Sequence, residues 1–126
     1  MTTRRRHGFT LVELLVVLAI IAMLLTVALP RYFRSVSHAE ESVLKQNLSL
    51  LRDALDKHYG DTGSYPAKLD ELVTRKYLRQ IPVDPITRSE TTWVVVPPTD
   101  AKLGGVFNVR SGAPGTARDG TPYEKW

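Results

Sequence analysis

The sequence predicts an α+β fold in which one long N-terminal helix packs on a small antiparallel sheet and a short second helix. Three observations predict it. An apolar run from Phe9 to Leu29 passes directly into a helical stripe of apolar residues that extends to about residue 59. A short periodic segment follows at 65–78. Two valine-rich segments at 92–96 and 106–110 are then bounded by Pro and Gly, as strands are.

Composition limits the class of protein. The 126 residues are enough for one domain, and 43% hydrophobic with 24% charged residues excludes a disordered chain. Because the chain has no cysteine, disulfides, thiolate metal sites and thiol catalysis are excluded. Most of the net charge of +4 comes from Arg4, Arg5 and Arg6. We therefore expect no nucleic-acid partner.

The apolar run is long enough to cross a membrane. At about 1.5 Å per residue, a helix from Phe9 to Leu29 is about 31 Å long, close to the thickness of the hydrocarbon core of a bilayer. Arg4 to Arg6 lie in a very short polar flank, which favours a cytoplasmic N-terminus.

Glu13 is the one charge within this run. A charge inside a spanning helix is costly and usually has a partner, yet no Lys, Arg or His lies between Phe9 and Pro30. The partner must therefore come from another chain, from a newly made charge or from lipid headgroups. Alternatively, Glu13 lies only about one turn from the membrane surface and snorkels to water.

The N-terminal residues resemble the class III signal of type IV prepilins and type II secretion pseudopilins. The resemblance is carried by the basic leader that ends at Gly8, by Phe9 and Glu13, and by the apolar helix up to Pro30. It implies cleavage between Gly8 and Phe9 by a prepilin peptidase, N-methylation of Phe9, and pairing of Glu13 with the N-terminus of a neighbouring subunit. An ordinary secretory signal peptide cut near Ala28 is the competing interpretation, but its apolar region is shorter and carries no charge.

The helix is expected to continue beyond the membrane. Pro30 predicts a kink rather than an end, because it removes one hydrogen bond. The apolar stripe is formed by Val43, Leu44, Leu48, Leu51, Ala54, Leu55 and His58 or Tyr59. Gly60 is expected to end the helix, and His58 is expected to be a packing residue. The charged positions on the other face, among them Glu41, Arg52 and Asp53, are expected to be solvated.

The region after the helix is expected to be rich in turns. Pro82 and Pro85 exclude a central strand, and Asp84 between them is expected to form a turn. Trp93 is expected in the core. The Gly-rich tail ends in Tyr123 and Trp126, which we expect to fold back onto the core.

The order of these elements is similar to the major pseudopilin of type II secretion systems. The resemblance implies a type IV pilin-like fold with three parts, a leader at 1–8, a membrane and assembly helix at 9–30, and a periplasmic domain at 31–126. It also implies a single-pass protein of the bacterial inner membrane that polymerises into a periplasmic pseudopilus for protein export. The implied partners are further copies of the chain, minor pseudopilins, the prepilin peptidase and the inner-membrane assembly platform. A type IV pilus pilin is the alternative, although the lack of cysteine argues against it, and a single-span periplasmic binding or enzymatic domain is a more distant one.

No catalytic motif is found, and we expect a protein that is not an enzyme. The P-loop, the Gly-x-Ser-x-Gly motif and the His-Glu-x-x-His motif are all absent from the sequence. The resemblance implies a calcium-binding loop near the C-terminus. Asp119 is the one acidic residue between Ser111 and Tyr123, a weak candidate ligand that Arg110 or Arg118 is placed to neutralise. Because calcium prefers several carboxylates, we expect turns and packing to hold this loop without the ion.

Overall fold

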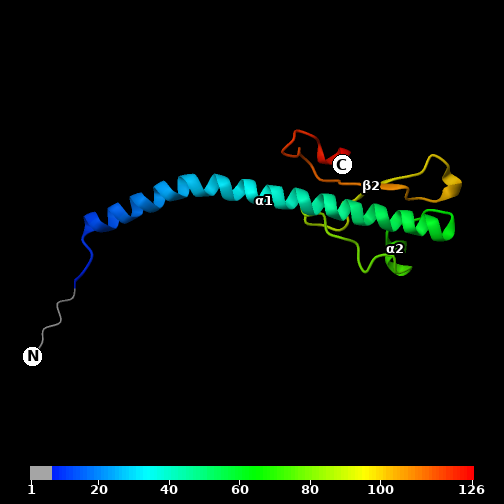
Figure 1. Ribbon diagram of the computed structural model, residues 1–126, viewed down its shortest axis with the longest axis horizontal. Coiled ribbons are helices and arrows are strands. Elements are labelled where there is room, and N and C mark those ends of the chain that lie inside the picture. Colours follow the sequence, from blue (N-terminus) through cyan, green and yellow to red (C-terminus); the bar gives the residue numbers. More distant parts are fainter. Residues whose placement is uncertain (1–6) are drawn as a thin grey trace, which may run out of the picture. The chain divides into compact units, whose positions relative to one another are not determined.

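A computed structural model describes residues 7–126, so Arg4, Arg5 and Arg6 lie outside the described residues. The chain forms two compact units that divide between Ser37 and His38. One helix, α1 (Leu11–Thr62), runs through both units, and it is followed by α2 (Asp70–Thr74), β1 (Val94–Val96), the 3-10 turn η1 (Ala101–Leu103), β2 (Asn108–Arg110) and the 3-10 turn η2 (Tyr123–Lys125) (Figure 1). This is the α+β fold that the sequence predicted.

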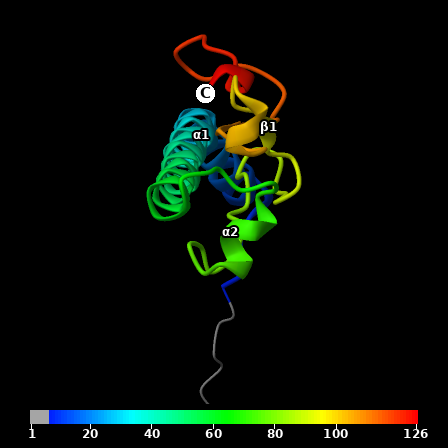
Figure 2. The same cartoon turned by 90° about the vertical axis from the view of Figure 1, so that its right-hand side faces the viewer.

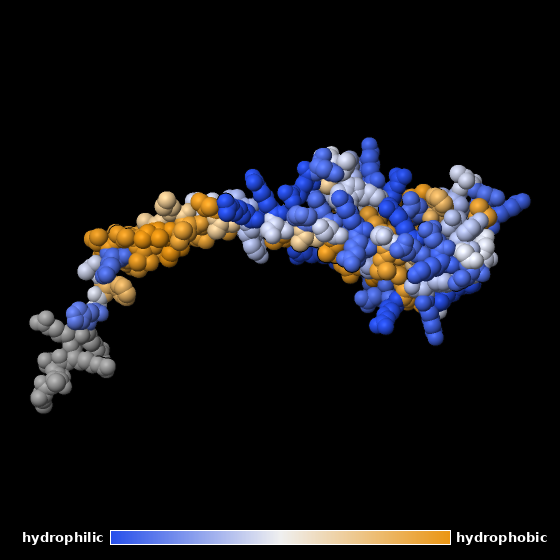
Figure 3. Space-filling view, in the orientation of Figure 1, coloured by the Kyte–Doolittle hydropathy of each residue, from blue (hydrophilic) through white to orange (hydrophobic). Residues whose placement is uncertain are grey.

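The N-terminal part of α1 is apolar around its whole circumference. Its large hydrophobic side chains are exposed, and they form a continuous apolar surface (Figure 3). Within residues 7–126, α1 is the one helix that is long and apolar enough to cross a membrane. The helix continues through Pro30 without ending. A kink at Pro30 stays a prediction.

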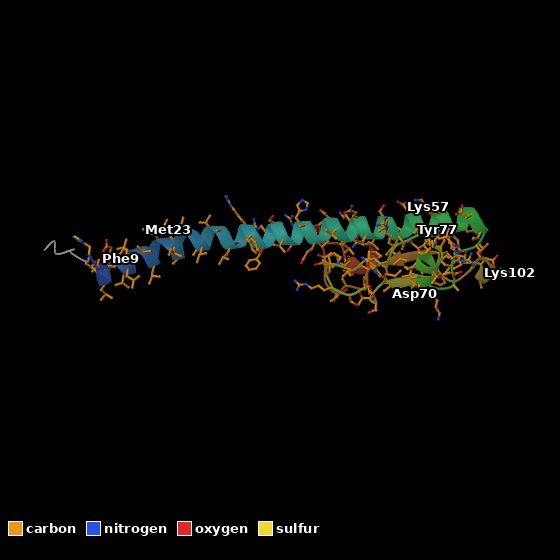
Figure 4. The ribbon with its side chains drawn as sticks, turned by 90° about the horizontal axis from the view of Figure 1, so that it is seen from below. Phe9, Met23, Lys57, Asp70, Tyr77 and Lys102 are labelled. Atoms are coloured by element: carbon orange, nitrogen blue, oxygen red, sulfur yellow. The ribbon has the colours of Figure 1, made fainter. Side chains whose placement is uncertain are left out.

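The C-terminal part of α1 is amphipathic. Residues spaced by three and four positions share one face of a helix, and here that face is buried against the rest of the second unit. The domain lies along one side of this helix, and Lys57 lies on the opposite side (Figure 4). The buried stripe consists of Leu44, Leu48, Leu51, Ala54, Leu55 and His58. The predicted stripe is confirmed, with His58 rather than Tyr59 at its end, except at Val43, which is exposed.

The helix ends later than Gly60, so that prediction was wrong. Gly60 lies inside α1, and Gly63 is the residue with a left-handed backbone, at φ +75°. The Gly63 amide donates to the Tyr59 carbonyl at 2.8 Å, and the Thr62 hydroxyl donates to the His58 carbonyl. Both bonds satisfy carbonyls of the last turn, which extends the helix past Gly60.

The second helix is much shorter than the predicted 65–78. Its first residues pair elsewhere, because the Tyr65 amide donates to the Leu103 carbonyl and the Pro66 carbonyl accepts from the amides of Gly105 and Val106. The last residues of the predicted helix form turns instead, in which the amides of Tyr77 and Leu78 donate to the Leu72 carbonyl. What remains is α2, with Leu72 completely buried.

The sheet has two antiparallel strands, and both are shorter than predicted. Val95 lies opposite Val109 at the centre of the pairing. Seen along α1, β1 and α2 lie on the same side of the helix (Figure 2). Trp93, just before β1, is buried as expected, and its ring N–H donates to the Pro82 carbonyl at 2.8 Å. Tyr123 is also buried and Trp126 packs against the core, so the prediction for the tail is confirmed.

Close backbone contacts depend on glycine. A Cβ atom on Gly105 would lie 2.5 Å from the Ala67 carbonyl oxygen, and one on Gly112 would lie 2.1 Å from that of Thr92. These neighbours are main-chain atoms, which cannot rotate away. The segments 65–67 and 103–106 therefore lie side by side only because side chains are absent at this point.

We expect Gly105→Ala to lower the free energy of unfolding by about 1–3 kcal/mol or more, the cost typical of overpacking. The matched control is Gly60→Ala, where an added Cβ meets nothing within 4 Å. Inside a helix this change is expected to stabilise by up to about 1 kcal/mol. Denaturant unfolding of the full chain in detergent, followed by the fluorescence of Trp93 and Trp126, measures both. Equal stability of the two variants would contradict the close-contact argument.

Candidate processing and assembly site

The predicted processing site is exposed at the start of the first unit. Phe9 is 85% exposed and lies just before the start of α1 (Figure 4). Gly8 is exposed too, with open space where a Cβ would lie. Residues 8–10 precede the first residue of α1 and are not helical. A non-helical, accessible backbone at this point is what a peptidase needs.

Glu13 belongs to a reciprocal cap at the helix N-terminus. The Glu13 Oε2 accepts a hydrogen bond from the Thr10 amide at 3.3 Å, and the Thr10 Oγ1 accepts one from the Glu13 amide at 3.2 Å. Thr10 is the residue before Leu11, the first residue of α1, so the two side chains form a capping box. The negative charge of Glu13 also lies in the first turn, where the helix dipole favours it.

Sequence reasoning missed this role for Glu13, although the signal was there. A Thr followed three positions later by Glu, directly before an apolar run, is the pattern of a capping box. The cap does not replace the need for a charged partner, because a backbone amide is neutral. It holds the carboxylate close to the backbone of residues 9 and 10.

Two charged residues on the helix face that was expected to be solvated instead tie α1 to the domain. Arg52 donates from Nε to the Asn108 Oδ1 at 2.9 Å and from its terminal nitrogen to the Val109 carbonyl at 3.1 Å. Glu41 Oε1 accepts from the Arg118 amide at 2.8 Å and from the Tyr123 hydroxyl at 3.2 Å. The expectation was wrong for these residues because each flanks the buried stripe and reaches a loop that folds back beside it.

The Glu41 contact affects Tyr123. Burial, followed by the nearby Glu41 carboxylate and its hydrogen bond, raises the pKa of the Tyr123 hydroxyl above its usual value. The neutral hydroxyl is therefore the form that the folded state favours. It stays a hydrogen-bond donor to Glu41 at neutral pH.

The candidate calcium residue Asp119 is engaged within its own turn. Its Oδ1 accepts from both the amide and the hydroxyl of Thr121, at 2.9 and 2.6 Å, and these bonds lower the pKa of Asp119. Neither Arg110 nor Arg118 forms an ion pair with it in the described part of the chain. The Asp100 carboxylate, which the sequence offered as a second possible ligand, instead caps η1 by accepting from the Lys102 amide.

A shallow groove of about 450 Å³ lies between α1 and the C-terminal loop. Its two carboxylates are Asp53 and Asp119, and Lys45 lies over the Trp126 ring at 4.7 Å from the ring centre. Among residues 7–126, no group of three or more His, Cys, Asp or Glu side chains is placed to hold a metal ion. The residues of the loop therefore do not fit a calcium site of the usual kind.

The buried polar side chains have structural roles. Asp84 is completely buried, and its carboxylate accepts from the Ile86 amide and the Ser111 hydroxyl at 2.8 and 2.7 Å. It forms the expected turn and also ties that turn to the end of β2. His58 lies in the core, as expected for a packing residue, with Nδ1 donating to the Ser64 carbonyl at 2.8 Å.

Comparison with known proteins agrees with the N-terminal geometry. Residues 3–29 match the family described as the prokaryotic N-terminal methylation motif. The chain is 30% identical over 101 residues to "Type II secretion system core protein G" of Pseudomonas aeruginosa, an alignment that covers 68% of this chain and 71% of that protein. The chain belongs to this family of major pseudopilins.

The chain is also similar to a second core protein G and to a fimbrial protein. The core protein G of Aeromonas hydrophila is 29% identical over 101 residues, again covering 68% of this chain and 71% of that protein. "Fimbrial protein EcpC" of Eikenella corrodens is 30% identical over 124 residues, covering 92% of this chain and 78% of that protein. No solved structure matches the chain.

Thr10→Ala is expected to fray the first turn of α1 at a cost of about 1 kcal/mol, because the cap on the Glu13 amide is lost. Glu13→Gln is the matched variant, since its side-chain carbonyl still accepts from the Thr10 amide. Amide hydrogen exchange at residues 11–13 of the full chain in micelles measures both. Faster exchange is expected in Thr10→Ala only, and equal exchange in the two variants would contradict the capping role.

Proposed function

We propose that this pseudopilin is a non-enzymatic filament subunit of a type II secretion system. It is inserted in the inner membrane through residues 9–30, processed between Gly8 and Phe9, and polymerised into a periplasmic pseudopilus that drives protein export. The single observation that carries the proposal is the placement of Gly8, Phe9 and Glu13 at the exposed start of an apolar helix. The family of core protein G supports the secretion role.

The geometry suggests how processing and assembly are linked. Cleavage after Gly8 makes a new α-ammonium at Phe9, directly before Thr10. The capping box uses Glu13 Oε2, and no hydrogen bond to Glu13 Oε1 is found within residues 7–126. One carboxylate oxygen thus holds the start of the helix, while the other is available to the ammonium of a neighbouring subunit.

Electrostatics then favour one register. Two opposite charges about 4 Å apart attract by roughly 4 kcal/mol at an effective dielectric constant near 20. An unpaired charge in an apolar filament core costs several kcal/mol. A subunit docked out of register leaves both the ammonium and Glu13 without partners. The partners implied beyond the filament are the prepilin peptidase, minor pseudopilins and the inner-membrane assembly platform.

A type IV pilus pilin is the second candidate function, favoured by the alignment with the fimbrial protein over 92% of this chain. The two functions differ in their machinery. Genes for a secretin, a secretion ATPase and further pseudopilins beside this gene would support secretion. A neighbouring retraction ATPase gene would support the pilus.

Processing is tested by co-expression with a prepilin peptidase. Intact-mass spectrometry is expected to show loss of residues 1–8 and the addition of one methyl group at Phe9. Gly8→Leu, which adds a bulky side chain at an open position, is expected to stay unprocessed. Cleavage near Ala28 would contradict the proposed site.

Assembly is tested by separating the charge of Glu13 from its cap. Glu13→Gln keeps the acceptor for the Thr10 amide but removes the negative charge, so it should insert in the membrane and fail to form filaments. Thr10→Ala keeps the charge and weakens the cap, so it should assemble, with reduced yield. Electron microscopy and a secretion assay in cells lacking the wild-type chain provide the readouts. Normal filaments from Glu13→Gln would show that charge pairing is not required.

We also propose that the loop at 111–123 holds its conformation without calcium, since its one acidic side chain is already bonded to Thr121. Calorimetric titration of the full chain with calcium is expected to show no binding in the micromolar range. A dissociation constant well below millimolar that disappears in Asp119→Ala would overturn this proposal and restore the mechanism that the family resemblance implies.

A further inference from the structure

Four consecutive residues just beyond the apolar run form a ring around α1. Arg31, Tyr32, Phe33 and Arg34, here called the Arg31–Arg34 collar, are all exposed and helical. Tyr32 is 63% and Phe33 64% exposed, and their rings meet edge to face with centres 5.9 Å apart. Within residues 7–126 neither arginine forms an ion pair.

The collar places side chains on every side of the helix, and this indicates what kind of surroundings it contacts. Successive residues of an α-helix are about 100° apart, so four in a row cover the whole circumference. Arg31 and Arg34 are three positions apart and share one side, while the two aromatic rings cover the other. A contact with one protein neighbour needs only a stripe along the helix. Side chains on all sides of the helix instead fit a medium that surrounds it completely, as a membrane does.

The position of the collar along the helix fits the membrane surface. From Leu11, the first residue of α1, to Pro30 the helix rises by about 29 Å, close to the thickness of the hydrocarbon core, so the next turn lies at headgroup level. Pro30 has no N–H, so the Thr26 carbonyl lacks its usual helical donor. Inside hydrocarbon an unsatisfied carbonyl is costly, which places this turn close to the polar boundary.

The chemistry of the collar completes the argument. Tyrosine and other amphipathic aromatic rings are enriched at the membrane interface, and guanidinium groups bind phosphate with paired N–H donors. We propose that the Arg31–Arg34 collar is an interfacial anchor, in which Tyr32 and Phe33 fix the depth of the helix and Arg31 and Arg34 bind phosphates of anionic phospholipids in the outer leaflet. The anchor rests on the proposed insertion of residues 9–30. It holds the subunit at a defined depth until a filament takes it up.

The chain offers a clean test because it has no cysteine. A fluorophore attached to Ala28→Cys reports the boundary, and one attached to Ala19→Cys reports the middle of the apolar run. The full chain is reconstituted in vesicles of equal parts phosphatidylglycerol and phosphatidylcholine, with bromine on one lipid at a time. Quenching then gives the depth of each label and the enrichment of either lipid around it, whichever way the chain inserts.

The expected result is deep quenching at position 19, and shallow quenching at position 28 that is stronger with brominated phosphatidylglycerol. Each Lys or Arg near an anionic membrane surface strengthens binding to that surface by roughly fivefold. The preference for phosphatidylglycerol should therefore be lost in the double variant Arg31→Gln, Arg34→Gln. The double variant Tyr32→Ala, Phe33→Ala should instead shift the depth of the label at position 28. Lys57→Gln, an exposed cation of the other unit, is the control and should change neither quantity.

Two outcomes would overturn the anchor alone. One is equal quenching of the label at position 28 by brominated phosphatidylglycerol and brominated phosphatidylcholine, while the label at position 19 is deep in the membrane. The other is an unchanged depth in the aromatic variant together with loss of its filaments, which would assign the collar to contacts between copies of the chain. A label at position 19 that deep bromines do not quench would overturn the insertion itself, and the anchor with it.

Discussion

The constraint on which this structure depends is that one continuous helix must satisfy two surroundings. Along its first part, α1 exposes apolar side chains in every direction, which is stable only in an apolar medium. Along its second part it buries a single stripe and keeps the rest polar. The change occurs around Pro30 and the Arg31–Arg34 collar, where the missing N–H of a proline is least costly. The helix is continuous through this point, so one element carries both the apolar and the amphipathic segment.

The domain is small, and its sheet alone does not explain its stability. Each strand of three residues is too short to form an independent sheet, so the sheet depends on the core that it shares with the buried stripe of α1. The polar ties at the edges of the stripe close the structure. Arg52 fixes β2, Glu41 fixes the C-terminal loop, and Asn47 donates to the Val83 carbonyl at 2.8 Å. These bonds hold three separate segments, a strand and two loops, along one helix.

Much of this could be predicted from the sequence because the strongest signals are periodic and local. The long helix, its buried face, the two strands and the buried Trp93 follow from spacing. Errors arose where a distant segment decided the outcome. The short helix lost its first turn because Tyr65 and Pro66 pair with residues near Gly105, and no local pattern shows that pairing. The contacts of Glu41 and Arg52 were missed for the same reason, since a charged helix position does not reveal which loop returns to it.

Glu13 is a different case from Glu41 and Arg52. Its local partner, Thr10, could be read from the sequence, whereas its proposed charged partner belongs to another copy of the chain. The capping box with Thr10 explains why the carboxylate is tolerated at the start of an apolar helix before any neighbour is present. A cap between neutral donors and a carboxylate leaves the charge itself uncompensated. The same residue therefore stabilises the helix of the free subunit and keeps a negative charge available. Under the proposed processing, cleavage at Gly8 would create a positive charge beside this position, so only the processed chain would carry both halves of the proposed ion pair.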